Sequence, residues 1–117
     1  MSADVWIQHK PCSHCGRSGS PDGDSEADRL NITYNLSKML AAAGFCGWQI
    51  LREMPARIAG SHIRTVLDHM RQDEDRWRAM NPANGWGDYD TCLQIRMRHW
   101  AERCIAAGND ATIGGWL

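Results

Sequence analysis

A chain of 117 residues, 43% of them hydrophobic, is long enough to form one domain with its own core, so neither a metal nor a disulfide is strictly required for folding. The 13 Lys and Arg side chains balance 14 Asp and Glu, and a net charge of -1 excludes a global positive field that would draw the protein onto nucleic acid. No apolar run approaches the ~18 residues of a membrane span, and no apolar signal segment opens the chain. We therefore expect a single domain, residues 1–117, that is cytoplasmic and has no membrane contact.

The N-terminal segment predicts a short strand that leads into a pair of cysteines. Residues 5–9 alternate in the manner of a half-buried strand. Cys12 and Cys15 follow in the C-x2-C-G spacing of a zinc knuckle, in which two thiolates can bind one tetrahedral ion, and His9 is a third candidate ligand. The further candidates for a fourth ligand are His14, Cys46, His62 and His69. No second C-x2-C pair follows, so a structural zinc and a pair of reduced, unligated cysteines are both open interpretations.

The other cysteines indicate neither a disulfide framework nor a second metal site. Five cysteines is an odd number for a chain without an export signal. Cys92 and Cys104 fall on one predicted helix about 18 Å apart, so they cannot share an ion and are expected to be small core residues. Residues 16–29, which follow the knuckle, are rich in Gly, Ser and Asp and predict a mobile loop.

A row of short polar side chains precedes the first predicted helix. Residues 30–35 alternate like a strand, and residues 36–43 then take up helical spacing. Thr33 or Asn35 is the natural N-cap of this helix, and Gly44 is the natural C-cap. The polar row therefore has two interpretations: it caps the helix, or it forms a polar wall that reads a small ligand.

The rest of the chain predicts more helices and a closing strand. Helices are expected at residues 45–53, 57–80 and 88–107. The second of these is either unbroken or interrupted before Trp77, and Asp88 caps the third. A weak strand signal at residues 111–117 suggests pairing beside residues 5–9. The predicted class is α+β, with about four helices packed on a small sheet formed by the N- and C-terminal strands.

Arginines recur every seven residues along the long helical stretch. They are Arg57, Arg64, Arg71 and Arg78. An unbroken helix would place them in one basic stripe that drifts only ~20° per heptad. Asp68 and Asp75 follow two of them by four residues, which is typical of a solvated, ion-paired face. The row is thus either such a face or a surface for an anion or an acidic partner.

A turn-rich decapeptide, residues 81–90, separates the last two predicted helices. Its Asn-Pro and Asn-Gly pairs are strong turn signals, so a helix cannot run through it. Trp86 stands between Gly85 and Gly87, and such glycines allow another backbone or a ligand to approach the indole closely. The indole is therefore either a plug in the core or a stacking platform at a binding site.

No catalytic signature is present in the sequence. It contains no G-x-S-x-G elbow, phosphate loop, H-E-x-x-H motif or cysteine phosphatase loop. Asp88 and Asp90 would lie on opposite sides of their element, which does not suit a catalytic carboxylate pair. We therefore do not expect an enzyme.

Two motifs resemble a family of small proteins encoded by bacteriophages and related mobile elements. The first is N-I-T-Y-N-L at residues 31–36, with Met39 beyond it, and the second is N-P-x-N-G-W-G-x-Y at residues 81–89. The resemblance covers roughly residues 30 to 105. It implies a phage setting, but it carries no activity, cofactor or catalytic residue onto this chain.

The leading hypothesis is a stoichiometric phage-type binding protein that counters host defence. One route is sequestration of a small nucleotide, in which rings stack on the base, short polar side chains read its edges and Arg64 or Arg71 neutralises phosphate. The candidate ligand-binding residues are Asn31, Thr33, Tyr34, Asn35, Arg64, Arg71, Asn84, Trp86 and Tyr89. The other route is direct blockade of a host defence protein by Trp and Arg hot spots.

Two other classes remain open. A zinc-stabilised nucleic-acid-binding accessory protein would use Cys12 and Cys15 structurally and the arginine row on phosphates, and its affinity would fall steeply with salt. A structural phage component would instead self-assemble, for example as a homodimer.

Overall fold

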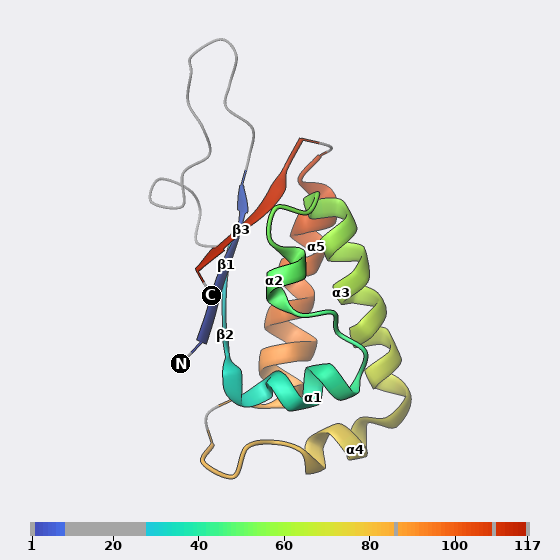
Figure 1. Ribbon diagram of the computed structural model, residues 1–117. Helices are drawn as coiled ribbons and strands as arrows, with labels where there is room; N and C mark the ends of the chain where they lie inside the picture. Colours follow the sequence, from blue (N-terminus) through green and yellow to red (C-terminus); the bar gives the residue numbers. More distant parts are fainter. Residues whose placement is uncertain (1, 9–27, 86, 109, 117) are drawn as a thin grey trace.

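The computed structural model describes residues 2–8, 28–85, 87–108 and 110–116, which form a small sheet covered by helices (Figure 1). Strands β1 (Ser2–Gln8), β2 (Arg29–Thr33) and β3 (Thr112–Trp116) form an antiparallel sheet in the order β2-β1-β3. The predicted pairing of the N- and C-terminal strands is confirmed, and the alternating segment before the first helix adds the third strand.

Strand register assigns one face of the sheet to the core. Ala3, Val5 and Ile7 of β1 are buried and alternate with residues of the other face. Val5 lies opposite Leu30 of β2, and Ile7 lies opposite Ile113 of β3. Because antiparallel partners share a face, each strand adds to the same apolar surface.

The helices gather on one side of this sheet (Figure 1). They are α1 (Ser37–Ala42), α2 (Trp48–Leu51), α3 (Ala56–Met70), α4 (Glu74–Ala79) and α5 (Arg98–Ala106). The 3-10 turns η2 (Tyr34–Leu36) and η3 (Arg71–Asp73) precede α1 and α4, and the π-helix η4 (Tyr89–Met97) runs directly into α5. The α+β class is confirmed. No described helix combines the length and apolar content that crossing a bilayer requires.

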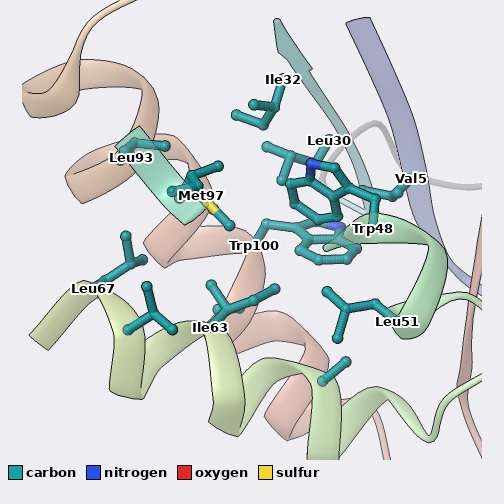
Figure 2. Close-up of a cluster of buried hydrophobic side chains, with 14 of the residues drawn as sticks. Val5, Leu30, Ile32, Trp48, Leu51, Ile63, Leu67, Leu93, Met97 and Trp100 are labelled. Atoms are coloured by element: carbon teal, nitrogen blue, oxygen red, sulfur yellow. The ribbon is translucent and has the colours of Figure 1, made fainter. Parts of the chain in front are cut away.

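Two tryptophans join the layers of the core. Trp48 of α2 and Trp100 of α5 meet edge to face, with ring centroids 6.4 Å apart, between the strands and α3 (Figure 2). The indole N–H of Trp100 donates to the carbonyl oxygen of Asp28 at 3.0 Å, so its polar atom is satisfied inside the core. Cys104 is buried, which confirms it as a small core residue, whereas Cys92 is half-buried and packs against the edge of the same core.

Local capping follows the sequence. The hydroxyl of Thr33 accepts from the backbone N–H of Asn35, and the carboxylate of Asp88 accepts from that of Thr91. Gly44 has φ +96°, and the next residue donates back to Leu40, which ends α1. Thr33 thus caps η2, which leads into α1, and Asp88 caps η4, whereas α1 itself follows Leu36 without a side-chain cap.

The long helical stretch is interrupted before Trp77. This is the second of the two alternatives that the sequence left open. Because α3 ends at Met70 and a 3-10 turn precedes α4, the four arginines do not share one straight helix. The expected pairing of Asp68 and Asp75 with arginines four residues earlier is wrong. Asp68 instead pairs with Arg98 of α5 at 2.8 Å, and Asp75 pairs with Arg78 three residues later on α4 at 3.4 Å.

Candidate functional site

A groove lies between α1 and the start of α2, and we call it the α1–α2 groove. It consists of two adjoining cavities of about 350 and 280 Å³. Both cavities are lined by Ser37, Cys46, Gly47 and Trp48. The larger one adds Tyr34, Gln49 and Ile50, and the smaller one adds Leu40, Ala41 and Phe45. The combined size is that of a pocket for a small ligand or a few side chains.

Contacts to α3 hold the wall of the groove in place. The backbone N–H of Cys46 donates to Nε2 of His62 at 3.2 Å. The ring of Phe45 stacks on that imidazole and meets Trp48 edge to face, with centroids 5.8 and 4.8 Å apart respectively. Gly47 has φ +101°, a conformation that favours glycine. The connection between α1 and α2 is therefore pinned to a long helix.

The lining of the groove is apolar and formally uncharged. Its polar groups are the hydroxyls of Tyr34 and Ser37, the amide of Gln49 and the thiol of Cys46. Ile50 is 61% exposed, although it is a large aliphatic residue. A charged ligand group would lose its water here without gaining an opposite charge, whereas an apolar group would be buried favourably.

The geometry of Cys46 does not activate its thiol. The imidazole of His62 faces the backbone N–H of Cys46, and the thiol contacts the carbonyl oxygen of Gly47 at 3.6 Å. Burial raises the pKa of the Cys46 thiol. An activated nucleophile needs a lowered pKa or a base on the sulfur, so this arrangement favours a neutral thiol that lines the groove.

A second polar centre lies where the corner between α3 and α4 meets η4. The side-chain oxygen of Gln94 accepts from Arg71 and twice from Arg98, while its amide donates to the carbonyl oxygen of Leu67 and to the hydroxyl of Tyr89. The Tyr89 hydroxyl in turn donates to Glu74 at 2.9 Å. These groups form hydrogen bonds with one another, so they connect elements of the fold rather than form a ligand site.

The charged side chains at this corner also pair with one another. Arg78 donates to both carboxylate oxygens of Asp90, and these hydrogen bonds lower the pKa of Asp90. Burial and the hydrogen bond to Glu74 raise the pKa of Tyr89 to about 12. Arg71 and Arg78 of the predicted basic row are therefore engaged with polar and acidic groups, while Arg57 and Arg64 are exposed on α3.

The predicted nucleotide-binding residues face different environments. Asn31 lies on the outer face of the sheet, where its amide donates to Ser2 and Asp4. Arg64 is exposed on α3. The side chain of Tyr89 is fully buried and its hydroxyl donates to Glu74 of α4, so the ring presents no exposed face for stacking in this structure. These residues do not form one pocket.

The polar row and the decapeptide turn do meet at one point. A Cβ placed on Gly87 would lie 2.6 Å from Cγ2 of Thr33, so the turn packs closely on the start of η2. The side chain of Asn81 supports this turn by accepting from the backbone N–H of Tyr89 at 2.8 Å. Asn35 and Asn84 are both exposed. Of the nine predicted ligand-binding residues, Tyr34 lines the α1–α2 groove.

The predicted zinc ligands and the predicted platform fall outside the described residues. They are His9, Cys12, Cys15 and Trp86. Within the part of the chain that the structure does describe, no three His, Cys, Asp or Glu side chains are grouped to hold a metal ion. A zinc site at the knuckle therefore stays a prediction.

Sequence reasoning missed most of the groove. It placed Trp48 on a short apolar helix and named Cys46 only as a candidate zinc ligand, and it gave no role to Ser37 or Gln49. The available signal was the pair Gly44 and Gly47, which bracket Phe45 and Cys46 and permit a tight connection between two short helices.

Comparisons with known proteins identify no relative of this chain. No protein-family model, curated protein or solved structure matches the chain significantly.

Proposed function

We propose that this chain is a non-enzymatic binding protein that recognises a partner protein by burying an apolar part of that partner in the α1–α2 groove. The observation that carries the proposal is the exposed Ile50 at an apolar, uncharged groove whose wall is pinned to α3. Burial of apolar surface contributes about 25 cal/mol per Å², and a preformed groove avoids much of the ordering cost of binding.

A second exposed aliphatic residue lies on the helix that supports the groove wall. Ile58 of α3 is 46% exposed and precedes His62 by four residues, so it shares a helix face with the imidazole that supports the groove wall. Single exposed aliphatics are ordinary on protein surfaces, and Ile58 is not among the residues that line the groove, so the proposal rests mainly on Ile50.

The groove favours a protein partner over a nucleotide. No Lys or Arg lines it, so the phosphates of a nucleotide would meet no opposite charge. The dispersal of Asn31, Arg64 and Tyr89 weighs against a nucleotide site elsewhere. The two sequence motifs resemble a family of small phage-encoded proteins. In a phage setting the partner would be a host defence protein, which the bound chain would block stoichiometrically.

Selection from a displayed random peptide library tests the proposal without a known partner. The wild-type protein is immobilised, and enriched peptides are then measured against Ile50→Asp and the matched control Ile95→Asp. Ile95 is exposed to nearly the same degree, 64%, but lies on η4 and does not line the groove. We expect enriched peptides to bind wild type and Ile95→Asp alike and to lose at least tenfold in affinity for Ile50→Asp.

Two outcomes would overturn the proposal. One is a library that yields no enriched peptide, and the other is enriched peptides that bind Ile50→Asp as tightly as wild type. A parallel thermal-shift measurement with a panel of mononucleotides and cyclic nucleotides tests the competing hypothesis, because a nucleotide that raises the melting temperature while no peptide is enriched would favour sequestration.

A further inference from the structure

The two cavities of the α1–α2 groove are both mostly apolar, but they differ in the polar side chains that line them, and this difference specifies the occupant more closely. The smaller cavity is bounded by Leu40, Ala41, Phe45 and Trp48, and we call it the apolar half. The larger cavity is bounded by Tyr34, Ser37, Gln49 and Ile50, and we call it the polar half. Ser37 and Trp48 line both, so a ligand that fills one half continues into the other.

We infer that the groove binds a short, uncharged, extended segment of a partner protein, with one large apolar side chain in the apolar half and the adjoining peptide groups in the polar half. This inference rests on the proposed function and names the kind of segment that the groove selects.

The apolar half suits a single anchoring side chain. Its volume of about 280 Å³ is at the lower end for ligand pockets, and its walls are an aromatic ring, an indole and short aliphatic groups. The hydrogen bond from Cys46 to His62 and the stacking of Phe45 on that imidazole fix the wall before a ligand arrives. A preformed apolar pocket of this kind is typical of a site for a hot-spot residue.

The polar half suits peptide groups rather than charges. The hydroxyls of Tyr34 and Ser37 and the amide of Gln49 each donate and accept hydrogen bonds, which matches the N–H and C=O of a backbone. A helical segment uses these backbone groups internally, whereas an extended segment presents them. A carboxylate or an ammonium in either half would be desolvated without a counter-charge.

Titration of blocked peptides into the isotopically labelled full-length protein tests the inference. The peptides are N-acetyl-Gly-X-Gly amides in which X is Leu, Phe, Trp, Ala, Glu or Lys, and amide chemical shifts report binding. We expect shifts in residues 37–50 for the Leu, Phe and Trp peptides, and at least tenfold weaker binding when X is Ala, Glu or Lys.

Two neighbouring alanines provide matched variants. Ala41 and Ala42 are both exposed on α1, but only Ala41 lines the groove. Ala41→Trp fills the apolar half and should weaken binding at least tenfold, whereas Ala42→Trp should leave it unchanged. Gln49→Leu should weaken binding about three- to tenfold, as expected for one lost hydrogen bond. Thermal unfolding of each variant confirms that the fold is kept.

The outcomes separate this inference from the proposed function. Glu or Lys peptides that bind as well as the Leu peptide, or an Ala41→Trp variant that binds like wild type, would overturn the inference. Library peptides that still depend on Ile50 would then leave the proposed function standing. If no blocked peptide shifts residues 37–50 and no library peptide is enriched, both are overturned.

Discussion

Gln94 connects more elements than any other single side chain at the corner between α3 and α4, although nothing in its sequence position indicates this. It accepts from Arg71 and Arg98 and donates to Leu67 and Tyr89. Gln94→Met keeps a similar shape but leaves these partners without their shared group. We expect the free energy of unfolding to fall by about 2–4 kcal/mol, because buried polar groups that lose a partner each cost about 1–3 kcal/mol.

Urea unfolding measures this loss, and Gln72 provides the control. Gln72 is exposed on η3 at the same corner, so Gln72→Met should change the free energy of unfolding by no more than about 0.5 kcal/mol. Equal effects of the two substitutions would show that the Gln94 network adds nothing to stability.

At the scale of elements, the decapeptide turn is fitted to η2 through Gly87. This residue has φ +101°, and an added Cβ would lie 2.6 Å from Thr33 and 3.3 Å from Leu36. Gly87→Ala should therefore combine backbone strain with a clash and lower the free energy of unfolding by about 2–4 kcal/mol. Gly85→Ala is the matched control, because φ is +76° but no atom lies within 4 Å, so about 1–2 kcal/mol of strain remains. Equal losses of stability in the two variants, measured by thermal unfolding, would refute the clash.

Helices α3 and α5 approach closely at Gly60. A Cβ there would lie 2.5 Å from the carbonyl oxygen of Ala101 and 2.8 Å from Cβ of Cys104. Replacement of glycine by alanine inside a helix normally raises the free energy of unfolding by about 1 kcal/mol. At Gly60 the close approach of the two helices should make the same substitution destabilising. We expect Gly60→Ala to lower the melting temperature, while Ser61→Ala on the exposed neighbouring position should leave it unchanged or raise it. A stabilised Gly60→Ala protein would mean that the two helices can move apart at little cost.

The elements that the sequence predicted well are those with local causes. Alternation at residues 5–9 identified the second half of β1, which begins earlier at Ser2, and side chains within three residues of each helix start identified the caps at Thr33 and Asp88. The groove was not predictable in this way, because its wall depends on a contact between Cys46 and His62, 16 residues apart. The burial of Tyr89 likewise depends on Glu74 and on the π-helical start of η4, neither of which periodicity reveals.

At the scale of the whole molecule, two buried neutral groups predict how stability responds to alkali. Burial raises the pKa of Tyr89 from 10.0 to about 12 and that of Cys104 from 9.0 to about 12. In the unfolded chain both groups release their protons at their ordinary pKa values, while the folded protein retains them. The unfolded state therefore binds fewer protons above about pH 9, and the free energy of unfolding must fall as pH rises from about 9 toward 12.

Variants at the two positions assign this pH dependence. Tyr89→Phe removes one titrating group and should flatten the fall above about pH 10, even though it lowers stability at neutral pH by leaving Glu74 and Gln94 without their shared hydroxyl. Cys104→Ala should flatten only some of the part that begins near pH 9, because burial also raises the pKa of the Cys46 thiol, which contributes in the same direction. Tyr34→Phe leaves both groups in place and should keep the wild-type slope. Urea unfolding at intervals from pH 7 to pH 11 measures all three slopes, and a wild-type slope in Tyr89→Phe would show that the folded protein opens around this phenol before the phenol ionises.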